Sequence, residues 1–494
     1  MPEESEVKAD RSRPLHDRVF QNIVGLLSGR VLGLLLSGFT SILLARYLGS
    51  LDLGRYAALY AYVTLFGWLG SFGLDQIITR ESARRRDEAG SILMTGTLIG
   101  AIFCGSASIL AFLSAPAAGY TGQLRWLLVI VTVDLLILTP AKWPGMVFQV
   151  DLRQWLGVSI GLFRQVIWIL VIVVCASLKA SLHWLVAGRL FCGLVETGIT
   201  LAVSFRFFVQ PWRILYGEIR TLLIHAAPVG FSTLAVGIYH RIDQVLLHKL
   251  VNDRELGQYV VAVNLTEILS AFPAALMASM FPILSQLATD EPRFDQYVRL
   301  SFRYLNVLAF GLCIIIALGS RNIIHLLYGQ AFVIAAPMLA ALIWSECGAF
   351  FGSVMSCGLI ARNLQGLTVV PNVLGAVFNL ALNLVFIPRW GGLGAAWATT
   401  ISNLIAGVLA FLLFPAARRL ADLGLRTFVS AAAAAALTML LGVPLAGLPI
   451  LVKLSLGAII YISMIWLMGL FGRDDLLRAW SLVSGKRATL ESQA

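Results

Sequence analysis

Long segments without a charged residue recur along the whole chain, and short segments rich in basic and polar residues separate them. The longest of these uninterrupted segments cover residues 91–124, 322–345, 368–388, 390–417, 427–452 and 454–472. Each has close to, or more than, the about 20 residues that an α-helix needs to cross roughly 30 Å of hydrocarbon. Residues 91–124 are long enough for two such helices and contain Pro116, where a helix is expected to break. The pattern therefore predicts an all-α polytopic membrane protein.

The same pattern, applied to the whole chain, predicts about fourteen spanning helices. We place them near residues 22–45, 53–78, 91–115, 123–146, 156–178, 182–209, 221–248, 256–283, 300–327, 332–360, 368–388, 392–415, 428–449 and 450–471. The last pair forms either two short helices or one hairpin interrupted around Pro449. Residues 1–21 are polar and lack the apolar core of a secretory signal, so we expect the first span to act as the targeting signal.

Composition and charge agree with a membrane protein and predict its orientation. Apolar residues make up 59% of the 494 residues and charged residues only 13%, about half the charged share of soluble domains. If the amino terminus is cytoplasmic, about 23 Lys and Arg residues lie on the cytoplasmic side and about 8 on the other, as the positive-inside rule requires. Both termini are therefore predicted to be cytoplasmic. Arg84 to Arg86 close a cytoplasmic loop, which favours attraction to anionic lipids over nucleic acid as a partner.

A short motif occurs twice, once after the first predicted span and once after the seventh. Residues 46–56 and 249–259 both contain a basic residue, five further residues, an acidic residue, Leu, Gly, any residue and Tyr. The second half enters the membrane from the same side as the first, so we expect two six-helix bundles related by a parallel repeat. The predicted parts are a tail (1–21), two bundles (22–209 and 210–415), two further helices (416–471) and a second tail (472–494).

Helix one carries an every-fourth-residue stripe of small side chains. Its members are Gly25, Gly29, Gly33, Ser37 and Ser41. Small side chains let helix backbones approach closely in lipid, where no hydrophobic force drives helices together. We interpret the stripe as a packing surface and not as a ligand site.

Charged side chains inside the predicted spans are the main candidates for function. The basic ones are Arg30, Arg125, Lys142, Arg164, Arg189 and Arg241, and the acidic ones are Asp75, Asp134, Glu196, Asp243, Glu267 and Glu346. Each costs roughly 2.5–3.5 kcal/mol near the bilayer centre, so it is expected to face water or a partner. Arg125 lies near a helix end and can snorkel. Arg30, Arg164, Arg189 and Arg241 lie deeper and are candidates for substrate binding, although structural ion pairs with the acidic residues are an open alternative.

Neutral polar residues add further candidates. Asn379 and Asn383 share a face of the eleventh predicted span, where their amides could bind sugar hydroxyls or join helices. His240, Asp243 and His248 lie close together in the seventh span, but no third His stands nearby at ligand spacing, so no metal site is predicted.

Two further observations concern catalysis and energy. The chain contains no complete Gly-rich phosphate loop, which excludes ATP as the direct energy source. No loop predicted outside the cytoplasm exceeds about a dozen residues, which leaves little room for external catalytic loops. We therefore expect no enzyme and no cofactor, with a membrane-embedded enzyme as an alternative.

Several segments resemble the polysaccharide and oligosaccharide-lipid flippases, including O-antigen transporters, of the superfamily that also holds the multidrug extruders. The resemblance runs from about residue 20 to 415. It is carried by residues 44–49 with 53–56, Gly73-Leu74, Arg80-Glu81, Phe148-Gln149, 242–247 with 256–259, 327–329 with Phe332, and 379–388 leading into 392–399. Their order and spacing are more specific than any one of them.

The resemblance implies two six-helix bundles plus two carboxy-terminal helices, around a central cavity that opens alternately to each side. The implied cargo is a glycan on a polyprenyl diphosphate, moved to the outer leaflet of a bacterial cytoplasmic membrane for surface polysaccharide synthesis, with polymerase or assembly proteins as partners. Guanidinium groups of buried arginines suit this cargo, because they bind diphosphate oxygens bidentately and stay charged at physiological pH. Asp243, Glu267 and Glu346 are candidates for coupling to a proton or sodium gradient.

The resemblance leaves two related transporters as alternatives. One is a multidrug exporter of the same superfamily, although helix one lacks the acidic residue that such proton-coupled exporters use. The other is a flippase for the lipid-linked peptidoglycan precursor.

Overall fold

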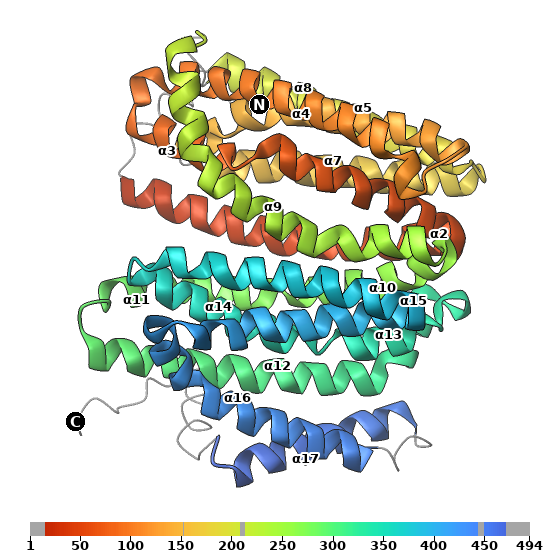
Figure 1. Ribbon diagram of the computed structural model, residues 1–494, viewed down its shortest axis with the longest axis vertical. Helices are drawn as coiled ribbons and strands as arrows, with labels where there is room; N and C mark the ends of the chain where they lie inside the picture. The colour runs from red at the N-terminus through yellow and green to blue at the C-terminus, as the bar shows by residue number, and fades with distance from the viewer. Residues whose placement is uncertain (1–14, 152, 208–212, 443–448, 471–494) are drawn as a thin grey trace. The chain divides into compact units, whose positions relative to one another are not determined.

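The computed structural model describes residues 15–151, 153–207, 213–442 and 449–470, and all regular structure within them is helical (Figure 1). The α-helices are α2 (Leu15–Ser71), α3 (Leu74–Arg84), α4 (Ala89–Ser114), α5 (Gln123–Gly145), α6 (Val147–Val150), α7 (Gln154–Ser177), α8 (Leu182–Phe207), α9 (Ile219–Leu250), α10 (Asp253–Leu269), α11 (Ala271–Gln286), α12 (Glu291–Tyr328), α13 (Ala335–Leu342), α14 (Ser345–Ala361), α15 (Val369–Gly407), α16 (Pro415–Gly442) and α17 (Ile450–Leu467). Short 3-10 helices join several of them. Because the described residues form helices and no strands, the expected all-α membrane fold is confirmed.

Two of the longest helices contain a glycine that reverses the chain. Helix α2 has 57 residues, which would span about 85 Å if straight, far more than a bilayer core. Gly49 at φ 66° interrupts it, and α2 folds back near its label in Figure 1. Helix α15 is interrupted by Gly391 at φ 54°. Only glycine adopts such angles without strain, and both breaks fall between predicted spans.

The spanning helices correspond to the predicted ones. Within the described residues, eleven helices are long and apolar enough to cross a membrane, or twelve when the two pieces Gln123–Ile137 and Lys142–Val150, bent by 42° relative to each other, count as one span. When α2 and α15 are each divided into two spans at their glycines, the number of spans increases from twelve to the fourteen that the sequence predicts. The last predicted pair is two helices, α16 and α17, and its linker 443–448 lies outside the described residues, as do both predicted tails for the most part.

Two predicted spans are less regular than the sequence indicates. The span predicted at 256–283 is divided between α10 and α11 at Ser270. The span predicted at 332–360 is divided between α13 and α14 before Ser345. Each pair still passes as one apolar stretch of membrane-spanning length.

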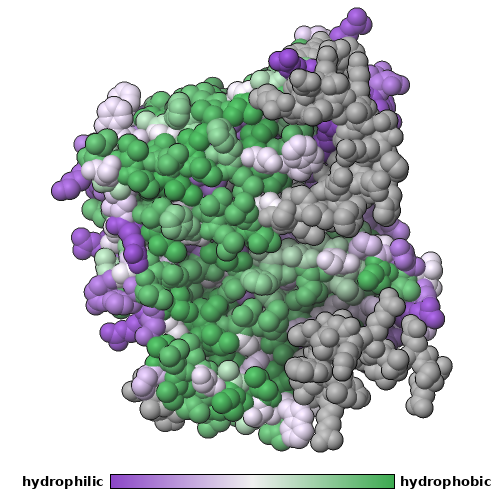
Figure 2. Space-filling model, turned by 180° about the vertical axis from the view of Figure 1, so that it is seen from behind, coloured by the Kyte–Doolittle hydropathy of each residue, from purple (hydrophilic) through white to green (hydrophobic). Residues whose placement is uncertain are grey.

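The surface is that of a protein in contact with lipid. Many large apolar side chains are exposed, such as Leu35, Leu113, Leu170 and Leu440. Figure 2 shows one face that is mostly hydrophobic, with hydrophilic side chains gathered mainly at its margins. Because a soluble protein rarely exposes contiguous apolar patches of this extent, the exposed surface supports a multi-pass membrane protein.

The chain divides into two compact units, each packed mainly within itself. The first unit comprises residues 1–268, 327–332 and 376–395, and the second comprises 269–326, 333–375 and 396–494. Each has its own apolar core: Trp143 and Ile78 belong to the first, and Phe302 and Phe351 to the second. These boundaries follow packing and not the internal repeat, so the division into bundles at 22–209 and 210–415 stays a prediction.

The two copies of the repeated motif contact each other inside the first unit. A Cβ atom on Gly54 would collide with the carbonyl oxygen of Asp253, and one on Gly257 would collide with that of Ser50. Gly54 and Gly257 occupy the same position in the two copies, and so do Ser50 and Asp253. The contact is therefore reciprocal, as expected of two elements related by a two-fold axis, and it leaves no space for a side chain.

A charged clamp lies on the loop that carries the three consecutive arginines. Arg85 donates to both carboxylate oxygens of Glu218, at 2.7 and 2.9 Å. This hydrogen-bonded carboxylate raises the pKa of Arg85 above its ordinary value. Arg85 therefore ties the loop before α4 to the start of α9, a role that the sequence did not indicate.

We expect Gly54→Ala to destabilise the protein by about 1–3 kcal/mol, because the added methyl group must push the two motif copies apart. Thermal unfolding of the detergent-purified chain measures the effect. Gly105→Ala in α4 is the matched control, since no atom lies within 4 Å of its added Cβ. Equal unfolding temperatures for the two variants would show that the reciprocal contact is not tight.

Candidate functional site

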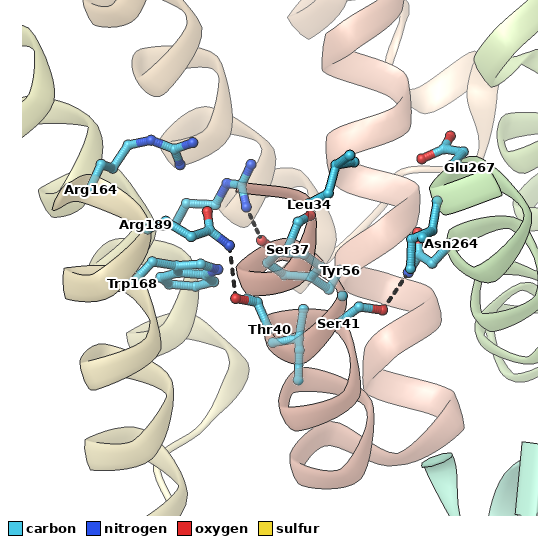
Figure 3. Close-up of a pocket in the computed structure, with 14 residues that line it drawn as sticks. Leu34, Ser37, Thr40, Ser41, Tyr56, Arg164, Trp168, Arg189, Asn264 and Glu267 are labelled. Carbon is cyan, nitrogen blue, oxygen red and sulfur yellow. Dashed lines mark hydrogen bonds between the residues drawn. The ribbon is translucent and has the colours of Figure 1, made fainter. Parts of the chain in front are cut away.

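A polar cavity of about 410 Å³ lies inside the first unit, between α2, α7, α8 and α10 (Figure 3). Its lining combines three charged residues with several neutral polar ones. The lining residues are Leu34, Ser37, Gly38, Thr40, Ser41, Leu44, Tyr56, Arg164, Gln165, Trp168, Arg189, Asn264, Glu267 and Ile268. A polar cavity of this size among membrane-spanning helices is a typical place for a polar ligand or headgroup to bind.

Arg189 of α8 is held by aromatic side chains. Its Nη1 donates to the hydroxyl of Tyr56 at 2.9 Å. The guanidinium carbon lies 4.5 Å from the ring centroid of Tyr60 and 5.6 Å from that of Trp168. Cation–π contacts and one neutral hydrogen bond fix the group in place without cancelling its charge. Arg189 therefore presents a positive charge to the cavity.

Arg164 of α7 is held differently, by a carboxylate. Its Nε lies 2.9 Å from Oε2 of Glu196 on α8, and both side chains are a little under one third exposed. Glu196 does not line the cavity. The buried carboxylate of Asp134 interacts electrostatically with both Arg164 and Arg189. Two acids behind the wall thus lower the cost of two guanidinium groups that reach the cavity.

Neutral polar groups complete the wall on the side of α2. Gln165 donates to the hydroxyl of Thr40 at 2.8 Å, and Asn264 donates to that of Ser41 at 2.9 Å. Figure 3 draws the hydrogen bond between Asn264 and Ser41 as a dashed line. Amide and hydroxyl groups both donate and accept, so they suit a ligand rich in hydroxyl groups.

The structure brings together only some of the predicted binding residues. Arg164 and Arg189 line the cavity, whereas Arg30 is an exposed residue of α2 outside the lining. Arg241 also stands outside the lining and lies 3.5 Å from Glu267, which does line it.

The predicted amides lie elsewhere. Asn379 and Asn383 are fully buried in α15, where Asn383 donates to Asn379 at 2.9 Å. This hydrogen bond lies within α15, so both alternatives for these two amides, a ligand contact and a contact between helices, stay predictions.

The three acids proposed for ion coupling occupy separate environments. Asp243 is buried and accepts from the hydroxyl of Tyr259 at 2.5 Å and from the backbone N–H of Gln244 at 2.8 Å. Glu346, in the second unit, accepts from Ser270 at 2.9 and 3.0 Å. Glu267 faces the cavity. Among the described residues, no group of three or more His, Cys, Asp or Glu could hold a metal ion.

The small-residue stripe on helix one lies in two environments. Cβ atoms added to Gly29 and Gly33 would meet Val158 and Leu162 of α7, so these two glycines pack against that helix as expected. Ser37 and Ser41 line the cavity. That the stripe binds no ligand stays a prediction.

Other lining residues stand at positions that the sequence could have indicated. Trp168 stands four positions after Arg164 and three after Gln165, so it shares a helix face with each of them. Tyr56 ends the first copy of the repeated motif. Their positions relative to Arg164 and to the repeated motif were therefore the sequence signal that could have identified these cavity-lining residues.

In the described residues, eleven or twelve helices are long and apolar enough to cross a membrane, and a cavity lined by charged side chains lies among them, which is the architecture of a multi-pass membrane protein. Comparison with solved structures identifies its fold. The structure resembles lipid II flippase MurJ in an inward closed conformation, with a TM-score of 0.72 and 14% identity over 93% of this chain and 100% of that one. It also resembles an inward-facing multidrug resistance MATE family transporter of the MOP superfamily, with a TM-score of 0.61 and 15% identity over 81% and 98%. The fold is that of the MOP superfamily.

The family follows from the sequence comparison. The profile described as "Polysaccharide biosynthesis protein" matches residues 19–288, more than half of the chain, so the protein belongs to this family. A second profile, MatE, matches residues 228–385. The resemblance found from the sequence motifs is thereby confirmed.

The sequence is also similar to that of a curated protein. It is the probable low-salt glycan biosynthesis flippase Agl15 of Haloferax volcanii, which is 25% identical over 38% of this chain. The match spans 41% of that relative's length.

We expect Glu196→Gln to tighten the binding of inorganic pyrophosphate by about tenfold, because the loss of the carboxylate beside Arg164 makes the electrostatic potential in the cavity more positive. Isothermal titration calorimetry of the purified chain measures the affinity. Glu346→Gln, at a buried carboxylate of the second unit, is the control. An unchanged affinity in Glu196→Gln would mean that the cavity does not bind this anion.

Proposed function

We propose that the protein is a flippase that moves a glycan linked to a polyprenyl diphosphate across the membrane by alternating access. The observation that carries this proposal is the pair Arg164 and Arg189, which line one polar cavity within a MOP fold. A guanidinium group stays charged at any physiological pH and binds phosphate oxygens bidentately. Two such groups on one wall suit a diphosphate, whose charges would otherwise be costly to bring between helices.

The neutral part of the cavity wall supports a sugar-bearing cargo. Thr40, Ser41, Gln165 and Asn264 supply hydroxyl and amide groups, which can exchange their mutual hydrogen bonds for bonds to sugar hydroxyls. The names of the similar proteins agree with this class of cargo, since one is a glycan biosynthesis flippase and another is a lipid II flippase.

The rival transporter function, export of cationic drugs, is less compatible with the cavity. A cation that entered it would meet Arg164 and Arg189, while Glu267 is the one acidic residue among the lining residues described. The two guanidinium groups would repel such a cargo. We therefore favour an anionic lipid headgroup.

The proposed direction and setting of transport come from the resemblance to the flippase family, combined with the orientation that the loop charges predict. With both termini in the cytoplasm, the cargo would be taken from the inner leaflet of a bacterial cytoplasmic membrane and released at the outer leaflet. There it would pass to polymerase or assembly proteins of a surface polysaccharide. Energy would come from an ion gradient and not from ATP.

We expect Arg164→Ala and Arg189→Ala to lower surface polysaccharide by about tenfold or more, because each removes a charged partner of the diphosphate. The measurement is surface glycan in a strain whose only copy is the variant, with protein abundance followed by immunoblot. Arg30→Ala, outside the cavity lining, is expected to have a smaller effect.

Other outcomes would favour other functions. Normal glycan in both cavity variants at normal abundance would refute the site. Resistance to cationic drugs on overexpression would favour the multidrug exporter, and rescue of cells depleted of the peptidoglycan-precursor flippase would favour that transporter. Turnover of a sugar-lipid donor by purified protein would favour an enzyme.

We further propose that Asp243 takes part in ion coupling, because its carboxylate is buried and bonded to the movable hydroxyl of Tyr259. Asp243→Asn keeps the shape and removes the charge, so we expect it to abolish the dependence of transport on an imposed proton or sodium gradient. Transport in proteoliposomes with and without each gradient measures this. Tyr259→Phe is expected to weaken the dependence, and full gradient-driven transport in Asp243→Asn would exclude the residue.

A further inference from the structure

A second polar cavity, of about 440 Å³, lies in the first unit and shares no lining residue with the first. Seven of its ten lining residues are polar or charged. They are Asp52, Arg55, Thr121, Gln123, Ser181, His183 and Asp253, and the other three are Leu124, Leu127 and Leu182. Such a lining is unusual for a chain in which 59% of residues are apolar, so the cavity requires an explanation of its own.

The cavity is built where several helices begin. Helix α5 starts at Gln123, α8 at Leu182 and α10 at Asp253, and Asp52 follows the break at Gly49 in α2. The cavity therefore lies at the ends of membrane-spanning helices, and most of its lining comes from four of them.

The charges of the cavity exclude two kinds of ligand. Nη1 of Arg55 lies 3.1 Å from Asp52, and its Nε lies 3.7 Å from Asp253. The guanidinium group thus occupies the place between two carboxylates that a metal cation would take. An anion would meet two carboxylates and one guanidinium group, which is unfavourable. A neutral ligand remains, and it must satisfy both donors and acceptors.

One of the two carboxylates is firmly positioned. Asp253 contacts Nδ1 of His248 at 2.5 Å, and the ring of His248 is stacked on that of Tyr120 at 4.4 Å. Asp52 has no comparable support among the described residues, and its side chain is 42% exposed. The cavity therefore combines a fixed acceptor with an accessible one.

The internal repeat supplies an independent comparison. Asp52 and Arg55 of the first copy correspond to Glu255 and Gln258 of the second. Glu255 accepts from the backbone N–H of Gly392 at 2.7 Å, and Gln258 donates to the carbonyl of Ala331 at 2.7 Å. The second copy uses these positions to hold its own main chain. In the first copy the side chain of Arg55 is 41% exposed and lines a cavity.

We infer that this second cavity binds neutral sugar residues of the transported glycan, an inference that rests on the proposed function. Arg55, Gln123 and His183 supply donors, and Asp52 and Asp253 supply acceptors, for vicinal hydroxyl groups. Buried Leu127 and Leu182 offer an apolar floor for the C–H face of a sugar ring. By the predicted orientation the cavity lies on the side opposite the termini, where the glycan is released.

Saturation-transfer NMR tests the inference on the full chain in detergent, with glucose, galactose and N-acetylglucosamine as probes. We expect Asp52→Asn and Arg55→Gln to weaken sugar binding by about tenfold, because each removes a charged hydrogen-bonding partner. Both side chains are partly exposed, so the fold is expected to survive, and thermal unfolding checks it. Arg254→Gln, an exposed neighbour of Asp253 outside the lining, is the matched control.

The outcomes separate this site from the proposed function. Loss of sugar binding in both variants, with pyrophosphate affinity unchanged, supports the site. Sugar binding as strong in Asp52→Asn and Arg55→Gln as in the wild type overturns it, and so does the absence of saturation transfer to the wild type at tens of millimolar sugar. Normal surface polysaccharide in both Arg164→Ala and Arg189→Ala, together with sugar binding lost in Asp52→Asn and Arg55→Gln, would leave the sugar site standing and refute the headgroup site of the proposed function.

Discussion

The positive charge of a guanidinium group between membrane-spanning helices must be balanced by carboxylates, aromatic rings or hydrogen-bond acceptors. The packing around the cavity of the first unit meets this requirement. At a bilayer centre such a group costs roughly 2.5–3.5 kcal/mol on an insertion scale. Arg164 is compensated by the carboxylate of Glu196, whereas Arg189 is surrounded by the rings of Tyr60 and Trp168 and by the hydroxyl of Tyr56. In neither case is the guanidinium group sealed away from the cavity. An ion pair without adjacent space would be purely structural, but here the pair borders a polar space that can admit a ligand.

Most of the fold could be predicted from the sequence, because a bilayer imposes a single length and a single polarity on each span. The reversals at Gly49 and Gly391 lie between predicted spans for this reason. The interruption at Ser270 was not predictable from hydropathy. The residues around such a break remain apolar, because neighbouring groups can form hydrogen bonds with the backbone groups that the break frees. The mean hydropathy of the segment therefore does not reveal the break.

The candidate site was predictable only in its charged part. Arg164 and Arg189 were identified because a charge in a span is costly and therefore rare. Thr40 and Gln165 cost little in a span and resemble residues that join helices. The ion pairs could not be predicted from the sequence either. The spacing places Glu196 on the same helix face as Arg189, but in the structure Glu196 pairs with Arg164 of the neighbouring helix. Which helices are neighbours is tertiary information that periodicity does not contain.

The repeated tyrosines show how the two copies of one motif came to differ. Tyr56 and Tyr259 occupy the same motif position. The hydroxyl of Tyr56 accepts a hydrogen bond from Arg189, and that of Tyr259 donates one to Asp243. A phenol can do either, because it has one donor and two lone pairs. The same scaffold therefore holds a cation near one copy and an acid near the other. The duplicated motif thus supplies one tyrosine hydroxyl that accepts from a cation and one that donates to an acid, and these are the two kinds of group that the proposed function assigns to the headgroup and to ion coupling.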